Sequence, residues 1–352
     1  MTTMRAARFE RATLGLTIRQ VSRPSPGPLE VLVRVEACGI CLSDVHLLDG
    51  SLPGFLPEVT PGHEAAGVVE AVGELVPSWQ PGQRVVIAGG RPCGQCPSCA
   101  RGHVEECLRF ETMGFNYDGA WAEYVVVPYF TLAGIPDDLP FAQAAILADA
   151  VATPYAGLVR RGALRPGETV GLWGIGGLGT HAVQIARLVG AALIVAVDPR
   201  PTARRRALAL GADHALDPSS TDVPAEIRRL TGGLGLDLTV DLVGANSVLA
   251  QAADCAGRFG RVLMIGLSLD RIELGAGVLF GVSSQTLLGH FGYRKRDLDQ
   301  LVDLVSRGRF DVSSSISAVM PLEDVGRGVE QLRTKDGDPI RLVVQPQISR
   351  PG

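Results

Sequence analysis

Four cysteines crowd into one short segment, with two, two and seven residues between them. They are Cys93, Cys96, Cys99 and Cys107. Four thiolates on so short a segment can close a tetrahedron around Zn²⁺, and Gly94 and Pro97 suit the sharp turns that this requires. Four sulfur ligands leave no coordination position open, so we interpret the cluster as a structural zinc site.

Disulfide bonds and an iron–sulfur site are the alternative uses of such a cluster. Residues 1–10 mix arginine and glutamate and lack the apolar stretch of a secretory signal, so we expect a cytoplasmic protein. Disulfides are rare in that reducing compartment. Iron–sulfur proteins use a similar Cys-x-x-Cys-x-x-Cys run, and spacing alone does not exclude them.

A second motif is a glycine-rich turn between an apolar run, residues 169–173, and a segment with helical spacing, residues 178–189. The turn comprises Gly174, Gly176, Gly177, Leu178 and Gly179. In a dinucleotide site the first glycine permits a tight turn, the second lets the backbone approach the pyrophosphate, and the third allows close helix packing. The helix N-terminus then favours the phosphate charge. We therefore predict a nicotinamide dinucleotide site.

Asp198 ends the next apolar run, nineteen residues beyond Gly179. A carboxylate at this place accepts hydrogen bonds from the adenosine ribose and repels a 2′-phosphate, which favours NAD over NADP. Nearby arginines that could accommodate a 2′-phosphate oppose this; they are Arg200, Arg204, Arg205 and Arg206. We expect at least two of them to belong to a solvated helix face, and we predict NAD, with NADP less favoured.

Further side chains that bind metals or move protons occur in three separate segments. They are Cys41, Ser43, Asp44 and His46 in the first, His63 and Glu64 in the second, and Asp149 in the third. A catalytic zinc needs three protein ligands and one position open for water or substrate. These segments lie far apart in the sequence, so only the fold can bring them together.

Two kinds of element must position these residues. Up to about residue 150, short valine-rich runs such as 31–35 and 124–127 alternate with Gly–Pro turns such as 25–28, 61–62 and 81–82. That pattern is typical of a barrel-like β domain. After residue 290 the sequence resembles neither half clearly, with an amphipathic helix expected at 298–307 and a closing strand at 341–344.

Between these parts, apolar strands alternate with helices. The expected strands are 169–173, 193–197, 238–243 and 262–265, and the expected helices are 178–189 and 201–210. Near-continuous apolar runs suit parallel strands that are covered on both faces. The alternation predicts an α/β fold with a doubly wound parallel Rossmann sheet.

Composition limits the function. The chain has 352 residues, enough for two domains, and its net charge of −4 argues against nucleic acid as a partner. The most apolar stretch, residues 182–197, is interrupted by Arg187 and Gly190. It falls short of the roughly 20 apolar residues of a spanning helix, so we expect no membrane association.

Taken together, the motifs resemble those of the zinc-containing medium-chain alcohol dehydrogenases over essentially the whole chain. The matching segments are residues 39–46, 62–64, 93–107, 115–128 and 174–179. Residues 148–150 with 153–155 look closest to bacterial secondary-alcohol dehydrogenases, whose third zinc ligand is Asp instead of Cys. The resemblance implies a discontinuous, barrel-like (GroES-like) catalytic domain, residues 1–150, with a structural zinc lobe at 90–110. It further implies a Rossmann domain at 151–290 and a C-terminal segment, 291–352, that returns to the catalytic domain.

The resemblance also implies a ligand set. Cys41, His63 and Asp149 would hold a catalytic zinc, so two zinc ions are expected per chain. Asp44 would hold the ring of His63 through its second nitrogen, which fixes the tautomer. Glu64 lies beside the zinc in family members, either as a transient ligand or in a structural hydrogen bond.

Three further expectations concern substrate, proton and cofactor. By resemblance, Ser43 would accept the alcohol proton and His46 would receive it through a ribose hydroxyl of the cofactor. Leu42 stands where some members place a basic residue on the pyrophosphate, and Arg341 resembles a C-terminal arginine that makes this contact instead. The active site is expected in the cleft between the two domains. Three aromatic side chains either line an apolar substrate pocket there or belong to the core: Trp121, Phe55 and Phe115.

The sequence thus predicts an NAD-dependent zinc alcohol dehydrogenase. It would interconvert a small or medium primary or secondary alcohol with its aldehyde or ketone. A polyol or threonine dehydrogenase of the same superfamily is one alternative. Another is a zinc-free quinone reductase-like or non-catalytic NADPH-binding protein, against which the intact Cys41, His63 and Asp149 argue. The resemblance also implies a homo-oligomer, with a tetramer favoured over a dimer.

Overall fold

The computed structural model describes residues 2–52 and 56–348. The chain divides into two compact units, which are described separately. The first unit comprises residues 1–150 and 294–352, and the second comprises residues 151–293. The first unit is therefore assembled from the two ends of the chain.

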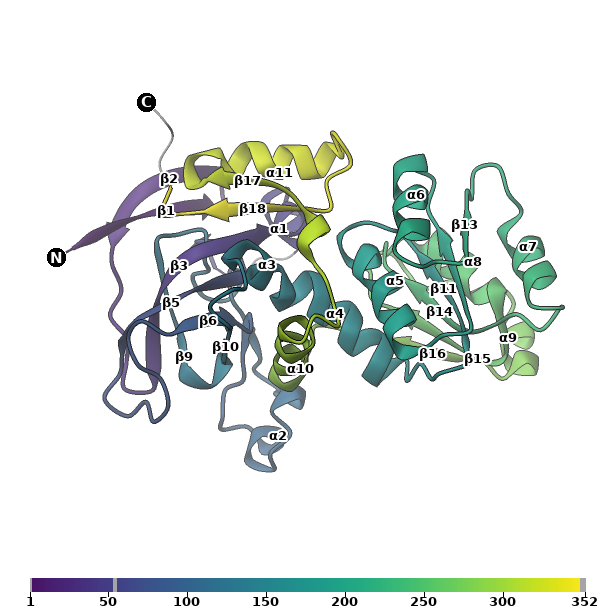
Figure 1. Cartoon of the computed structure of the whole chain (residues 1–352), viewed down its shortest axis with the longest axis horizontal. Helices are drawn as coiled ribbons and strands as arrows, with labels where there is room; N and C mark the ends of the chain where they lie inside the picture. The colour runs from purple at the N-terminus through teal and green to yellow at the C-terminus, as the bar shows by residue number, and fades with distance from the viewer. Residues whose placement is uncertain (1, 53–55, 349–352) are drawn as a thin grey trace. The chain divides into compact units, whose positions relative to one another are not determined.

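A seven-stranded sheet forms the frame of the first unit (Figure 1). Its strand order is β10-β6-β5-β3-β18-β17, and β9 also pairs with β3. The strands are β3 (Glu30–Ile40), β5 (Ala65–Val72), β6 (Arg84–Ile87), β9 (Tyr124–Pro128), β10 (Leu132–Gly134), β17 (Ile316–Pro321) and β18 (Arg341–Gln345). All described pairs are antiparallel except β17 with β18. The C-terminal strand β18 thus lies between β3 and β17, inside the sheet.

Two small sheets and several helices complete the first unit. The strands are β1 (Thr3–Glu10), β2 (Gly15–Ser22) and β4 (Glu58–Val59) in one sheet and β7 (Gly90–Arg91) with β8 (Glu111–Thr112) in the other. The α-helices are α1 (Leu42–Leu48), α2 (Pro97–Ala100), α3 (Phe141–Ile146), α10 (Lys295–Ser306) and α11 (Val325–Thr334). Single 3-10 turns are η1 (Val104–Glu106), η2 (Tyr129–Thr131), η5 (Ser313–Ser315) and η6 (Leu322–Asp324).

The valine-rich runs form the core of this unit because their side chains fill the space behind the sheet. Val31, Val33 and Val35 on β3 are fully buried, and they pack with residues from β5, β6, β9 and β18. Trp121 lies in the same core with no exposed surface. The barrel-like β-rich part that the sequence predicted is confirmed.

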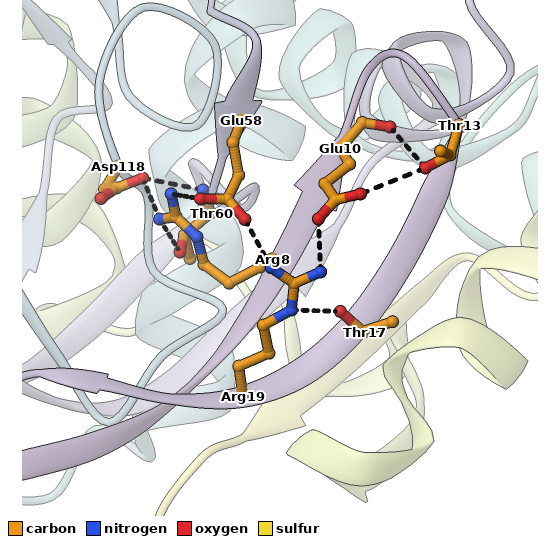
Figure 2. Close-up of polar contacts among 8 residues, drawn as sticks. All are labelled: Arg8, Glu10, Thr13, Thr17, Arg19, Glu58, Thr60 and Asp118. Carbon is orange, nitrogen blue, oxygen red and sulfur yellow. Dashed lines mark hydrogen bonds and ion pairs between the residues drawn. The ribbon is translucent and has the colours of Figure 1, made fainter.

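An ion-pair network ties β1 and β2 to the segment that leads to His63 (Figure 2). Arg8 donates to Glu58 at 2.9 Å and to Asp118 at 2.6 Å. Arg19 on β2 donates to Glu58 as well, at 2.9 Å. The Asp118 carboxylate also accepts the backbone N–H of Thr60 at 2.8 Å, so the network fixes the backbone three residues before His63.

The second unit contains a six-stranded parallel sheet with helices on both sides (Figure 1). Its strand order is β13-β12-β11-β14-β15-β16. The strands are β11 (Thr169–Trp173), β12 (Leu193–Val197), β13 (His214–Leu216), β14 (Leu236–Asp241), β15 (Ala256–Met264) and β16 (Thr286–Gly289). The helices are α4 (Ala152–Tyr155), η4 (Ala156–Arg161, of π type), α5 (Gly177–Val189), α6 (Pro201–Ala209), α7 (Val223–Leu230), α8 (Asn246–Cys255) and α9 (Gly277–Ser283). The order reverses between β11 and β14, which confirms the doubly wound Rossmann sheet.

One helical stretch in the described part of the chain, Phe141–Arg161, is long and apolar enough to cross a membrane by length and composition. Its mean hydropathy barely reaches the level of a spanning helix, and 78% of its most apolar segment is buried inside the structure. A helix in a protein core has the same properties, so the stretch carries no further conclusion.

Candidate active site

Three neighbouring strands of the first unit end at one place. Cys41 directly follows β3, His63 and Glu64 directly precede β5, and Arg341 begins β18. The register pairs Cys38 with Ala65 across β3 and β5, and Ile40 with Leu342 across β3 and β18. Because β3 lies between the other two strands, segments from three distant parts of the sequence meet here.

Asp149 joins this group from a short π-helix, Leu147–Val151, which follows α3. Its Oδ2 lies 3.3 Å from the Cys41 sulfur and 3.7 Å from Nε2 of His63. One ligand atom from each of Cys41, His63, Glu64 and Asp149 lies within 4.8 Å of the others. The three predicted ligands and Glu64 thus form one compact cluster.

The donor set fits Zn²⁺. One thiol sulfur, one imidazole nitrogen and one carboxylate oxygen are ligands that zinc takes at about 2.0–2.3 Å, and such a trio leaves a fourth position open. Both carboxylate oxygens of Glu64 are buried; Oε1 lies 2.9 Å from Nη2 of Arg341, whereas Oε2 has no hydrogen-bond partner in the described residues. A buried carboxylate oxygen without a donor is costly, and a divalent cation beside it would offset that cost.

Asp44 links the first two ligands. Its Oδ2 accepts the backbone N–H of Cys41 at 2.9 Å, in the reciprocal cap of helix α1. Its Oδ1 lies 3.2 Å from Nδ1 of His63 and is completely buried. A carboxylate at Nδ1 leaves Nε2 to face the cluster, which is the orientation that a metal ligand requires.

Arg341 is buried in the same cluster, with 2% of its surface exposed. Its Nη2 lies 2.9 Å from Glu64 Oε1 and 3.8 Å from both the Cys41 sulfur and Asp149 Oδ2. Burial raises the pKa of Glu64 to about 8, although the Arg341 guanidinium lowers it. The arginine therefore faces the ligand set of its own unit, and its predicted contact with a pyrophosphate stays a prediction.

Ser43 and His46 are both on helix α1. The Ser43 hydroxyl lies 3.3 Å from Nε2 of His63, beside the cluster. His46 lies one turn further along, and its side chain is 39% exposed. Its Nδ1 lies 3.0 Å from the hydroxyl of Ser51. One helix thus carries a hydroxyl beside the ligands and an imidazole at the surface.

The predicted apolar lining divides into three cases. The ring of Phe115 packs beside that of His63, with 5.6 Å between centroids, so it borders the cluster. Trp121 is instead fully buried, and its indole N–H donates to the carbonyl of Gly39 at 3.3 Å. Phe55 lies outside the described residues.

The four lobe cysteines converge on one point. The sulfur of Cys96 lies 3.5 Å from that of Cys99 and 4.0 Å from that of Cys107, and all four are within 4.8 Å of one another. Tetrahedral thiolates with Zn–S bonds of about 2.3 Å lie about 3.8 Å apart. The spacing therefore fits a single metal ion, whereas an iron–sulfur cluster would hold the sulfurs further apart, because its own atoms lie between them.

Backbone donors favour the thiolate form of Cys96 in this lobe. The backbone N–H groups of Cys99 and Leu108 lower the pKa of Cys96 to about 6. Those of Cys93 and Arg109 donate to the Cys107 sulfur at 3.2 and 3.4 Å. All seven cysteines lie in the described residues and are free, so the disulfide alternative is not realised.

The glycine turn in the second unit fits a dinucleotide. Gly174 has φ of +91°, and a Cβ at Gly179 would overlap the Gly174 carbonyl, so neither position tolerates a side chain. A Cβ at Gly176 would meet nothing within 4 Å, which leaves open space in front of helix α5. Leu178 is in the first turn of that helix, where backbone N–H groups point out of its N-terminus.

Asp198 directly follows β12, and its carboxylate is almost fully buried. It accepts the backbone N–H groups of Ile175 at 2.8 Å and Arg200 at 2.9 Å. The Arg200 guanidinium lies 3.0 Å from the same carboxylate and helps to hold the pKa of Asp198 below its usual range, although burial raises it.

The other arginines near Asp198 have different roles. Arg204 pairs with Asp217 at 3.0 Å, and Arg206 donates to the Ile175 carbonyl at 2.6 Å. Arg205 is exposed on α6. The structure therefore engages Arg204 and Arg206 in contacts within this unit and leaves Arg200 as the cation closest to the Asp198 carboxylate.

Two features of the site escaped the sequence analysis. The first is the pairing of Glu64 with Arg341, which depends on β18 lying beside β3. The second is the place of Gly39, where a Cβ would overlap the Glu64 carboxylate. The turn that carries Gly39 was recognised as a motif, but the sequence offered no signal that its missing side chain makes room for Glu64.

Two family models match the chain. The alcohol dehydrogenase GroES-like domain matches residues 27–137, and the zinc-binding dehydrogenase model matches residues 177–307. Among curated relatives, the NAD-dependent alcohol dehydrogenase of Sulfurisphaera tokodaii is 32% identical over 338 residues. That alignment covers 94% of this chain and 96% of the relative.

Solved structures show the same similarity. An alcohol dehydrogenase from a Thermus species superposes with a TM-score of 0.89 at 32% identity, covering 97% of this chain and 99% of that one. A zinc-binding dehydrogenase of Sinorhizobium meliloti, solved with NADP bound, superposes with a TM-score of 0.90 at 30% identity. It covers 98% of this chain and 100% of its own.

Proposed function

This chain belongs to the zinc-containing medium-chain alcohol dehydrogenases and is a zinc-dependent alcohol oxidoreductase, and from that premise we propose which residues carry its reaction. Cys41, His63 and Asp149 are assigned to a catalytic zinc, and the four lobe cysteines to a second, structural zinc. The observation that carries this assignment is the convergence of three donors of different chemistry beside the Ser43 hydroxyl.

The first unit supplies the ligands and the acid–base groups, and the second supplies the dinucleotide site. When bound, zinc supplies Lewis acidity that makes an alcohol hydroxyl easier to deprotonate. The nicotinamide, when bound, accepts the hydride in oxidation and returns it in reduction. Asp44 orients His63, and Glu64 with Arg341 sets the charge behind the ligands.

Two side chains on helix α1 are proposed to take part in moving the proton. We assign Ser43 as the group that accepts the proton of the substrate hydroxyl, because its own hydroxyl is beside the ligands and half-buried. His46, on the next turn of α1 and partly exposed, receives the proton before it passes to solvent. A hydroxyl beside the ligands and an imidazole at the surface are acid–base groups of the kind that transfer protons in enzymes.

Replacing Ser43 by Ala is expected to lower kcat/KM for alcohol oxidation about 10²- to 10⁴-fold, the usual contribution of one general acid–base group. Ser43→Thr keeps the hydroxyl and should recover most of the activity. Zinc content should stay at the parental level in both variants, since Ser43 is not assigned as a ligand. Steady-state kinetics with metal analysis checks this, and an Ala variant within threefold of the parent would rule out the assignment.

NAD is the proposed cofactor. The Asp198 carboxylate at the end of β12 supports it, because a negative charge there opposes a 2′-phosphate. Arg200 reduces that opposition by pairing with the carboxylate. The preference for NAD over NADP is therefore expected to be moderate rather than absolute.

Asp198→Gly is expected to reverse this preference. The change removes the negative charge that opposes a 2′-phosphate and the carboxylate that pairs with Arg200, so the NAD:NADP ratio of kcat/KM should fall on the order of 10²-fold. Arg205→Ala, on the exposed face of α6, serves as a control and should leave the ratio within about twofold of the parent. An unchanged ratio in Asp198→Gly would show that Asp198 does not select the cofactor.

We further propose a cytoplasmic homo-oligomer, with a tetramer favoured. The unpaired thiols support a reducing compartment. An uncharged stretch of the second unit supports oligomerisation, because residues 274–293 contain no Asp, Glu, Lys or Arg. Val278, Leu279, Val282 and Phe291 in this stretch are each more than 60% exposed, which is unusual for a monomer.

The activity is tested by following NAD reduction with a panel of alcohols. Butan-2-ol and benzyl alcohol should be oxidised in preference to sorbitol and threonine, and the purified chain should hold two zinc ions. Faster turnover of sorbitol or threonine would move the substrate class to polyols or amino alcohols. A chain without zinc would overturn the proposed function.

A further inference from the structure

We propose that Trp121 is a positioning residue that holds together the two backbone segments carrying Cys41 and His63. The inference rests on the proposed function, because these two residues are its zinc ligands. It assigns a role to a side chain that is not itself a ligand. The contacts that carry it come from the indole ring, from the backbone of residues 119–121 and from the network around Arg8.

The first contact is with the end of β3. The Trp121 indole N–H donates to the carbonyl of Gly39 at 3.3 Å, and the whole side chain is fully buried. Cys41 follows Gly39 by two residues. A hydrogen bond inside a dry core is costly to lose, because the acceptor left behind has no water to replace the donor. The indole therefore restrains the backbone that places the Cys41 sulfur.

The second contact is with the residue before His63. Gly62 has φ of +95°, and a Cβ there would lie 2.8 Å from the indole nitrogen and closer still to the adjacent ring carbon. The ring thus packs directly on the Gly62 backbone, which only a residue without a side chain permits. One flat side chain therefore touches both segments, Gly39 on one and Gly62 on the other.

Backbone hydrogen bonds keep Trp121 in this position. Its N–H donates to the Pro61 carbonyl at 2.9 Å, and its carbonyl accepts the N–H of Ala7 at 2.8 Å. The N–H groups of Gly119 and Ala120 donate to the carbonyls of Thr60 at 2.7 Å and Gly62 at 2.9 Å. The chain on either side of the indole is therefore paired along its length with the segment that leads to His63.

The network in Figure 2 anchors the same pairing at its outer end. Asp118 accepts both the backbone N–H of Thr60 and the guanidinium of Arg8, which joins residues 118–121 to β1. Trp121 is thus a rigid part of the frame rather than a side chain that can relax around a displaced ligand. Replacing a core residue without this role would lower the stability of the protein in proportion to the burial of that residue, and the zinc affinity would not change.

The chain offers matched controls, because each of its three tryptophans donates an indole hydrogen bond. Trp79, in the first unit, donates to the backbone carbonyl of Tyr129 at 2.9 Å. Trp173, in the second unit, is 2% exposed and donates to the Gln251 side chain at 2.9 Å. Trp79→Phe thus removes the same kind of bond from the same unit, and Trp173→Phe removes a tryptophan of similar burial.

The experiment measures zinc directly in the full-length protein. Trp121→Phe should release its catalytic zinc to a chromophoric chelator about tenfold faster than the parent, in the range seen when a supporting contact of a metal ligand is lost. It should also shift the visible absorption of the Co²⁺-substituted catalytic site, which reports ligand geometry. Trp79→Phe and Trp173→Phe should show the parental release rate and spectrum, even where they lower the melting temperature.

A second pair of variants covers the case in which Trp121→Phe fails to fold. Gly62→Ala drives a methyl group into the indole, whereas Gly82→Ala adds one at nearly the same φ, +92°, with nothing within 4 Å. Gly62→Ala should accelerate zinc release, and Gly82→Ala should not. A Cβ at Gly62 would also lie 2.9 Å from the Cys38 sulfur, so the difference between the two variants separates the packing of Gly62 against Trp121 and Cys38 from the strain of the backbone.

Each result has one meaning. Release rates and Co²⁺ spectra of Trp121→Phe that match those of Trp173→Phe would overturn the positioning role while leaving the proposed function intact. If the parent protein binds one zinc, and the lobe cysteines account for it, the proposed function fails before any variant is compared. The inference is supported if Trp121→Phe and Gly62→Ala release zinc faster than the parent and the control variants do not.

Discussion

Replacing Cys41 by Ala is expected to lower kcat/KM for alcohol oxidation by about 10³-fold or more while the chain still folds. Zinc at this site is worth several kcal/mol of transition-state stabilisation, and each 1.4 kcal/mol is a factor of about ten in rate. The sulfur is the only soft donor of its cluster, so its loss leaves His63 and two carboxylates around a site beside the Arg341 guanidinium. The Arg341 guanidinium, which lies 3.8 Å from the Cys41 sulfur, then opposes rebinding of the cation.

The zinc content separates loss of metal from loss of fold. The zinc content of Cys41→Ala should be one ion per chain instead of two, and its circular dichroism spectrum should be unchanged. Asp149→Ala should behave in the same way, because Asp149 Oδ2 lies 3.3 Å from the Cys41 sulfur in the same cluster. Cys38→Ala, a buried thiol three residues earlier that is not in the cluster, should keep the second zinc. Parental activity in both ligand variants would refute the catalytic site.

Replacing Cys96 by Ser should cost the protein its structural zinc and several kcal/mol of unfolding free energy. In small sites of this kind the binding free energy of zinc is also folding free energy. Little else stabilises the lobe, because its helix α2 is only four residues long. Several apolar side chains of the lobe, such as Leu108, are exposed and do not form a core. We expect the melting temperature to fall and residues 93–110 to become sensitive to protease.

Ser98→Ala is the control for that variant, because Ser98 is buried between two lobe cysteines and offers no sulfur. It should keep both zinc ions and a melting temperature close to the parental value. The catalytic zinc should remain in Cys96→Ser, so activity measured well below the melting temperature should persist. A melting temperature unaffected by loss of one zinc would show that the lobe does not depend on metal.

The lobe and the glycine turn could be predicted from sequence because each is local. All four lobe sulfurs come from one short segment, and the turn lies directly between a strand and the helix that it opens. No long-range packing is needed to bring their members together. The catalytic ligands are different, since only a resemblance connected Cys41 with His63 and Asp149 before the fold was known.

Strand ends were less predictable, for a physical reason. The sequence indicates a strand at 238–243, but β14 is Leu236–Asp241. At its start, the Asp237 carboxylate accepts the backbone N–H of Thr169 on the neighbouring strand β11, which an apolar pattern does not reveal. The strand ends early because the Asp241 carboxylate accepts the N–H groups of Val243 and Gly244, which turns the chain.

Side-chain environments were the least predictable. Trp121 and Phe115 are equivalent in the sequence as apolar candidates near the ligands. The structure buries one against Gly39 and Gly62 and places the other beside His63. Their difference depends on which strands flank residues 115–122, and that in turn depends on the register of β3 with its neighbours.

The position of β18 inside the first sheet has a consequence for how the protein is made. A ribosome delivers β3, β5 and β9 early, but β18, which pairs with residues 38–40 of β3, emerges only with residues 341–345. The second unit, continuous from 151 to 293, is complete before that strand appears. We therefore expect the N-terminal half to wait, unfinished, while the middle of the chain folds first, against the usual N-to-C order of domain folding. Arg341 arrives with the same strand, so the charge behind the zinc ligands is set only when synthesis is nearly over.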